Sequence, residues 1–137
     1  MNPQDVQTAI IDTIFDQVGG LHLYSNSADA PIPPALDVSL DQLTYGTTFD
    51  DGSEAVFLLR VIVGAVASQG SQAELYDYIA PQGQSSIPAA IAANNSLNGA
   101  VTSSYLLPTR RIGAVSLADG GTKYWSAELL LAVYGLE

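Results

Sequence analysis

The sequence predicts an α+β fold: a mixed, largely antiparallel sheet packed by an N-terminal helix and two short central helices. Three observations lead to this prediction. Apolar residues recur at helical spacing at the start of the chain, a long strand-like segment lies near its middle, and further strand-like segments follow two short helical ones. The 137 residues are 47% hydrophobic, which suffices for the core of one domain. Since no repeat or linker is visible, we expect residues 1–137 to form a single domain.

The first element is a helix predicted over residues 3–18. Asn2 can cap it, Pro3 occupies a position where a missing N–H costs nothing, and Asp5 lies near the positive end of the helix dipole. A Gly-Gly pair then ends the helix. Six apolar residues form the stripe that we expect to face the core: Val6, Ile10, Ile11, Ile14, Phe15 and Val18.

Short strands are predicted on either side of a proline-rich loop. Residues 21–25 form the first, and residues 35–49 alternate loosely enough for one or two more. Between them, residues 29–34 contain three prolines, which restrict the backbone and supply no N–H donor. This composition suits an arm that contacts a partner or another subunit, and an ordinary long connection is the alternative. The contact residues would be Asp29, Pro31, Pro33 and Pro34.

The strongest strand prediction covers residues 54–67. Both of its faces are apolar along most of their length, so we expect a central strand covered on both sides. Arg60 interrupts one face, and a charge at such a position needs an acidic partner or a route to water.

The first of the two short central helices is predicted over residues 71–80. Its start is indicated by the Ser71–Glu74 segment, which has the pattern of a capping box. We expect Leu75, Tyr76 and Ile79 to face inward.

The second short helix is predicted over residues 88–94. Its apolar residues are Ile87, Ala90 and Ile91. Three further strands complete the predicted sheet: residues 100–107, 111–117 and 123–134. The Asp119-Gly120-Gly121 segment is predicted to be a hairpin turn.

The charge is strongly acidic and unevenly distributed. Fourteen acids and four bases give a formal charge of −10; nine acids and no base lie in residues 1–59, which leaves −1 for residues 60–137. Because proteins that neutralise phosphates need clustered Lys and Arg, this balance argues against such a nucleic-acid binder. The absence of cysteine excludes a disulfide scaffold, a thiol nucleophile and a thiolate metal site.

The residues offer little catalytic chemistry. His22 is the only side chain that ordinarily titrates near neutrality, and no Gly-x-Ser-x-Gly segment accompanies it. Asp50, Asp51 and Glu54 could collect a cation, but they lack the spacing of a calcium-binding loop. We therefore expect no catalytic residue, no metal ligand and no cofactor.

Arg110 and Arg111 form the only basic pair. They are interpreted either as an exposed strand start or as a contact for an acidic neighbour, including the acidic first half of another copy.

No targeting or membrane-spanning segment is expected. The N-terminus lacks a basic region followed by an apolar run, as a signal peptide would have. The longest apolar stretch, residues 55–67, contains Arg60 and is shorter than the roughly 20 residues that cross a bilayer.

A succession of segments carries a family resemblance. QGSQAELYDYI at 69–79 leads into SSIPAAI at 85–91 and LNGAV at 97–101. A strand with the pattern Phe57-x-Leu59-x-Val61-x-Val63 precedes them, and YWSAELLLAV at 124–133 follows. This succession resembles the tail terminator proteins of long-tailed, siphovirus-type bacteriophages, especially those infecting actinobacteria.

The resemblance implies a structural virion protein and not an enzyme. Such a subunit assembles as a homo-hexameric ring on the tail tube protein, stops tube growth and offers a surface to the neck, or head–tail connector, protein. The ring would be assembled in the host cytoplasm and lie at the neck end of the tail, and DNA would pass through its lumen without specific binding.

The resemblance suggests a hypothesis for the acidic charge: acidic side chains that face the lumen would repel the moving DNA. The candidates are Asp12, Asp16, Asp50 and Asp51; the alternative is that these acids face outward or meet a basic partner. Two other functions remain open at this stage: a head–tail connector or head-completion protein, and a small acidic enzyme or ligand-binding domain.

Overall fold

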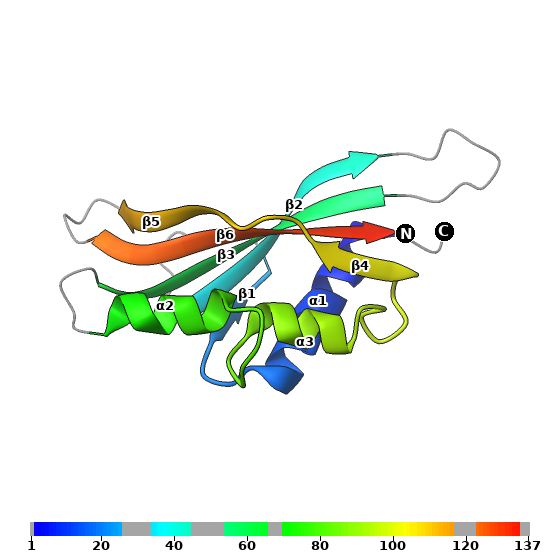
Figure 1. Cartoon of the computed structure of the whole chain (residues 1–137). Coiled ribbons are helices and arrows are strands. Elements are labelled where there is room, and N and C mark those ends of the chain that lie inside the picture. Colours follow the sequence, from blue (N-terminus) through cyan, green and yellow to red (C-terminus); the bar gives the residue numbers. More distant parts are fainter. Residues whose placement is uncertain (1, 26–33, 45–53, 66–69, 117–122, 135–137) are drawn as a thin grey trace.

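Residues 2–25, 34–44, 54–65, 70–116 and 123–134 are described in the computed structural model, and they form one sheet and three helices (Figure 1). The elements are α1 (Pro3–Gln17), β1 (His22–Tyr24), β2 (Ala35–Thr44), β3 (Glu54–Ala65), α2 (Ser71–Ile79), α3 (Ile87–Ala93), β4 (Ser103–Leu106), β5 (Arg110–Ser116) and β6 (Lys123–Tyr134). The sheet order is β1-β2-β3-β6-β4, and β5 also pairs with β6. Only the β1–β2 pair is parallel among these strands, so the predicted mixed, largely antiparallel α+β fold is confirmed.

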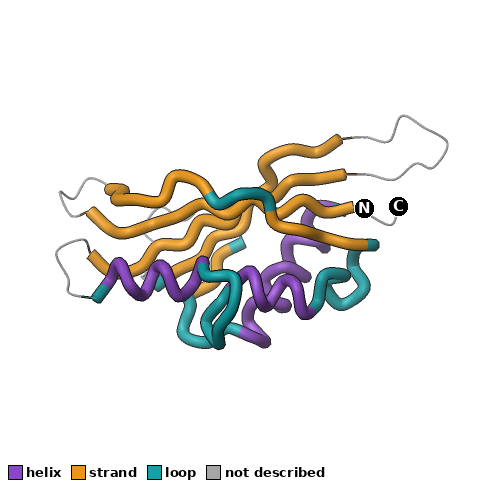
Figure 2. The backbone as a smooth tube through the Cα atoms, viewed as in Figure 1, coloured by secondary structure: helices purple, strands orange, loops and turns teal. Residues whose placement is uncertain are grey.

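All three helices lie on the same face of the sheet (Figure 2). α1 packs against β1 and β2, α2 packs against β3 and β6, and α3 contacts both helices and β4. The core lies between this helical layer and the sheet, and it includes the alternate residues of the two central strands: Ala55, Phe57, Leu59, Val61 and Val63 on β3, and Ala127, Leu129, Leu131 and Val133 on β6.

The opposite face of β3 corrects one prediction. Its residues Val56, Leu58 and Arg60 are only half-buried, and none of the described elements packs over them. The strand is central in the sheet, as predicted, but helices cover it on one side only. Among the described residues of this face, Val56 and Leu58 therefore keep contact with solvent, whereas Ile62 is buried.

The N-terminal helix follows its predicted capping, with one exception on its apolar stripe. The Asn2 side chain accepts a hydrogen bond of 2.9 Å from the Gln4 backbone N–H. Val6, Ile10 and Ile14 are fully buried, as the helical spacing predicts. Phe15 is instead 69% exposed, which corrects its assignment to the core. One residue beyond Ile14, it is rotated by more than a quarter of a turn from the buried face.

The start of α2 also differs from its prediction. Gly70, with φ of 87°, is the N-cap, and no side chain caps the helix, so the capping-box prediction is wrong. The Ser71 side chain is buried against Gly64 of β3 instead. The inward face of the helix therefore consists of Ser71, Leu75 and Tyr78. Tyr76 was predicted to face inward but is exposed.

The other element boundaries agree closely with the sequence. β2 is one strand of 10 residues within the predicted range 35–49. α3 begins after Ser86, whose hydroxyl accepts a hydrogen bond from the Ala89 N–H, and its predicted apolar residues are buried. The strand predicted from residue 100 begins at Ser103, because the Ala100 and Val101 N–H groups donate to the Leu97 and Ser96 carbonyls in the preceding turn. The predicted turn at 119–121 lies outside the described residues.

We expect Gly64→Ala to destabilise the protein by about 1 to 3 kcal/mol, because the new methyl would lie 2.5 Å from the Ser71 hydroxyl oxygen. Replacing Ser71 by Ala in the same chain should recover part of the loss. Gly113→Ala on β5 is the matched control, since nothing lies within 4 Å of its added methyl. Equal changes in the urea-unfolding midpoint for the two glycine variants would contradict the close approach of α2 to β3.

Candidate interaction surfaces

The sheet face that the helices leave open carries a row of polar side chains across five strands. Register pairing places Tyr24 beside Asp37, Asp37 beside Arg60, Arg60 beside Glu128, and Glu128 beside Arg110. The row therefore alternates negative and positive charge from β2 to β5, an order in which directly opposite residues attract one another.

The middle of this row is an ion pair. The Arg60 Nη2 lies 2.6 Å from the Asp37 Oδ2, and its Nε donates to the same oxygen over 3.1 Å. The Asp37 side chain is only 2% exposed, whereas Arg60 retains partial contact with solvent. The prediction that Arg60 needs an acidic partner is thus confirmed, and its partner comes from β2.

The β5 end of the row carries an excess of positive charge. The Glu128 carboxylate accepts a hydrogen bond of 3.2 Å from the Arg110 Nε, and it lies 3.6 Å from the Arg111 Nη1. Two arginines thus share one carboxylate. Arg111 is 70% exposed, so most of its guanidinium faces solvent and can meet a further acidic group.

A bulge turns the neighbouring apolar side chain outward. The β5–β6 register shifts between Arg110 and Gly113, and Arg111 has a left-handed φ of 54°. Bulges redirect side chains and interrupt pairing along a strand. Ile112 is 48% exposed as a result. We call Arg110, Arg111 and Ile112 together the β5 patch.

A second, oppositely charged surface lies on α1. Asp5, Asp12 and Asp16 are all exposed, and their spacing of seven and four residues places them along one line of the helix. Phe15 is adjacent to this line. We call these four residues the acidic stripe; it contains two of the predicted lumen-facing acids.

A third surface is aromatic and lies at the other end of the open sheet face. The Tyr105 and Tyr134 hydroxyls are 3.0 Å apart, and their rings stack with centroids separated by 5.8 Å. This hydrogen bond raises the pKa of Tyr134 to about 12, with smaller contributions from desolvation and from Glu54. The half-buried Val56 and Leu58 are on the same face of the neighbouring strand β3.

The predicted proline arm is described only at its last residue. The Pro34 carbonyl accepts a hydrogen bond of 2.9 Å from the His22 backbone N–H, and the His22 Nδ1 lies 3.2 Å away from the same oxygen. Asp29, Pro31 and Pro33, like the lumen candidates Asp50 and Asp51, lie outside the described residues.

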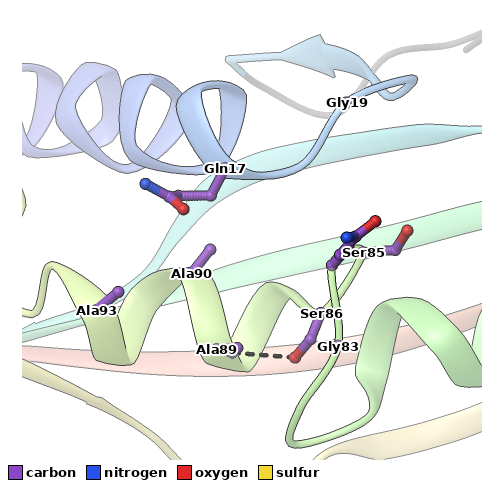
Figure 3. A pocket seen from close by; sticks show the side chains of 9 residues that line it. Gln17, Gly19, Gly83, Ser85, Ser86, Ala89, Ala90 and Ala93 are labelled. Atoms are coloured by element: carbon purple, nitrogen blue, oxygen red, sulfur yellow. Dashed lines mark hydrogen bonds between the residues drawn. The ribbon is translucent and has the colours of Figure 1, made fainter.

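A groove of about 610 Å³ separates the end of α1 from the start of α3 (Figure 3). Gln17, Gly83, Ser85 and Ala93 line it, together with the buried cap Ser86. The Ser86 hydroxyl already hydrogen-bonds to the Ala80 carbonyl and the Ala89 N–H. None of the lining side chains is ionisable, so the groove offers contact surface and not acid–base chemistry.

His, Asp and Glu do not gather in threes to form a potential metal site anywhere in the described ranges. None of the helices described has the length and apolar character needed to cross a bilayer. The chain matches no known protein-family model and no curated protein sequence.

Sequence reasoning found the Arg110–Arg111 pair but missed its surroundings. The line of acids on α1 could have been found from its helical spacing. The partners Asp37 and Glu128 could not, because only the register of distant strands brings them beside arginines.

We expect Arg60→Met to lower the free energy of unfolding by about 3 kcal/mol, because it leaves the buried Asp37 carboxylate without its partner. Adding Asp37→Leu to that variant removes the unpaired charge and should recover most of the loss. Arg110→Met is the control and should cost less than about 1 kcal/mol, since its ion pair is more exposed. Equal losses for the two arginine variants in urea unfolding would contradict a structural role for the buried pair.

We expect Tyr134 to ionise near pH 12, well above the ordinary tyrosine value of 10.0. Because folding raises this pKa, the associated stabilisation is complete below about pH 10 and is lost as the pH rises through about 12. Ultraviolet titration of tyrosinate, compared with a Tyr134→Phe variant, measures the shift. Tyr105→Phe should return the Tyr134 titration toward its ordinary range; an unchanged titration would contradict the hydrogen bond as its main cause.

Proposed function

We propose that this chain is a tail terminator of a long-tailed bacteriophage: a structural virion subunit that caps the tail tube as a hexameric ring. In that position it stops tube growth, offers a surface to the head–tail connector, and surrounds the DNA that passes through its lumen.

The observation that carries this proposal is the sequence resemblance at 69–101 together with the part of the fold that these residues build. The positions quoted for the resemblance include buried residues of α2, α3 and the following loop: Leu75, Tyr78, Ile87, Ala90, Ile91, Leu97 and Val101. Gly83 and Gly99 have positive φ in the connections between them. The resemblance therefore involves residues that determine the helical layer, and it supports a shared architecture.

The surfaces support a subunit with several neighbours. The half-buried Val56 and Leu58 on the sheet face opposite the helices, the exposed arginines of β5 and the acidic residues of α1 lie on separate elements of one small chain, and each group is suited to a protein contact. A protein that caps a tube and joins a neck needs contacts to tube, to neck and to its own copies.

The net charge supports the proposed relation to DNA. A formal charge of −10 disfavours tight binding to phosphates, and a ring through which DNA must move benefits from weak contact. The function needs no catalytic group.

We expect the purified protein to cap tubes assembled from the tail tube protein of the same virus. Electron microscopy should show added density at one end of each tube with six-fold symmetry, and tubes should stop growing when the protein is present during assembly. An equal amount of an unrelated acidic protein is the control.

Two results would reject the proposal. Attachment to DNA-filled heads, with no effect on tube length, would identify a head–tail connector instead. Binding to neither heads nor tubes would remove the virion function altogether.

A further inference from the structure

We propose that neighbouring copies of this chain bind head to tail, with the acidic stripe of one copy seated on the β5 patch of the next. This inference deepens the proposed function by naming the two surfaces that join neighbouring subunits. The number of six subunits rests on the proposed function.

The scarcity of basic residues restricts where a second copy can bind. The chain has four basic side chains, and Arg60 is engaged with the buried Asp37. The other three, Arg110, Arg111 and Lys123, are exposed and all lie on β5 or at the start of β6. Acidic side chains on a second copy can therefore find a cationic side chain that is not already paired with a buried carboxylate along this edge of the sheet.

The acidic stripe is the surface best matched to that edge. It presents three carboxylates in line, and α1 contains no basic residue. Phe15 lies beside them and is 69% exposed, although a phenyl ring makes no hydrogen bond that would offset its contact with water. The β5 patch offers the counterpart, an exposed Ile112 next to two arginines. Apolar side chains surrounded by complementary charges are typical of the centre and rim of protein interfaces.

A rival acidic surface lies on α2, where Glu74 and Asp77 are exposed near Tyr76. The Tyr76 hydroxyl, however, accepts a hydrogen bond of 2.9 Å from the Gln72 side chain, which gives that ring a polar partner within its own helix. The acidic stripe on α1 has three carboxylates, one more than the acidic surface on α2, and its Phe15 ring has no polar partner. The acidic stripe is therefore the better match for the β5 patch.

The acidic stripe and the β5 patch lie at opposite edges of the sheet, so the same contact can repeat from one copy to the next. The sheet order places β1 and β2 at one edge and β5 at the other, and α1 packs beneath β1 and β2 (Figure 1). A copy that uses its acidic stripe therefore keeps its β5 patch free for another copy. Such a heterologous contact generates a ring when the rotation between copies closes, whereas two β5 patches placed face to face would repel.

The bulge in β5 indicates contact through side chains and not by sheet extension. The left-handed Arg111 interrupts the regular edge of the strand, and interrupted edges resist pairing with another strand. The exposed arginines and Ile112 can then meet a helix.

The contact can be tested by cross-linking in solution, because the wild-type chain contains no cysteine. Thr8→Cys places a thiol beside the acidic stripe, Ala114→Cys places one beside the β5 patch, and all the native residues of both surfaces are kept. Ala73→Cys on α2 is the matched control, since it is likewise exposed and lies beside the rival acids. With a short bis-maleimide, we expect Thr8→Cys and Ala114→Cys to cross-link roughly tenfold faster than Ala73→Cys and Ala114→Cys.

Charge reversal provides the second arm of this test. One variant carries Asp12→Lys and Asp16→Lys, and the other carries Arg110→Gln and Arg111→Asp. Each of these variants also carries Thr8→Cys and Ala114→Cys. Each variant alone should cross-link roughly tenfold more slowly, because its stripe and patch then repel. A mixture of the two variants should regain the rate, since opposite charges meet again in alternating copies. Thermal unfolding of each variant verifies that its fold is intact.

Faster cross-linking of the Ala73 pair, equal rates for both pairs, or failure of the mixture to regain the rate would overturn the proposed contact. The tube-capping assay is independent of this result. Specific head-to-tail cross-linking without capping would reject the terminator function alone, and capping without it would reject these two surfaces alone.

Discussion

The ion pair between Asp37 and Arg60 is the constraint around which the open side of the sheet is organised. A carboxylate with 2% exposure is stable there only beside its cationic partner, so the pair ties β2 to β3 in one register. The separate register of β3 with β6 aligns Arg60 with Glu128, and Glu128 in turn holds two arginines at the β5 edge. The row of alternating charges therefore needs three strand registers, and the buried ion pair stabilises the first of them.

Local signals in the sequence were sufficient for most elements but not for every face. The cap at Asn2 and the spacing of Val6, Ile10 and Ile14 located α1, and alternation located β3 and β6. Phe15 was misassigned because it lies next to the buried positions in sequence but off their line on the helix. The Ser71–Glu74 pattern failed because Gly70 already begins the helix in a conformation open to glycine. At Phe15 the position around the helix axis decided the exposure of the side chain, and at Ser71 the preceding glycine decided how the helix begins.

The surfaces were harder to predict, since they depend on pairings between distant segments. Arg110 and Arg111 attract attention in any sequence this poor in bases. That they share Glu128, and that a bulge exposes Ile112 beside them, follows from the β5–β6 register. The Tyr105–Tyr134 pair likewise requires β4 and β6 to meet. The fold class could be predicted from periodicity, whereas these contacts needed the three-dimensional structure.

The pairing of β3 with β6 has a consequence for the order of events during synthesis. Its register joins Glu54 to Tyr134 and Ala65 to Tyr124, so the two central strands are separated by most of the second half of the chain. Contacts this distant along the chain form late, because a long loop must be closed first. β5 also pairs with β6, so its arginines reach their places only when that strand has left the ribosome. A nascent chain thus lacks the ordered β5 patch until β6 is available, so the contact proposed between copies would form only after that step.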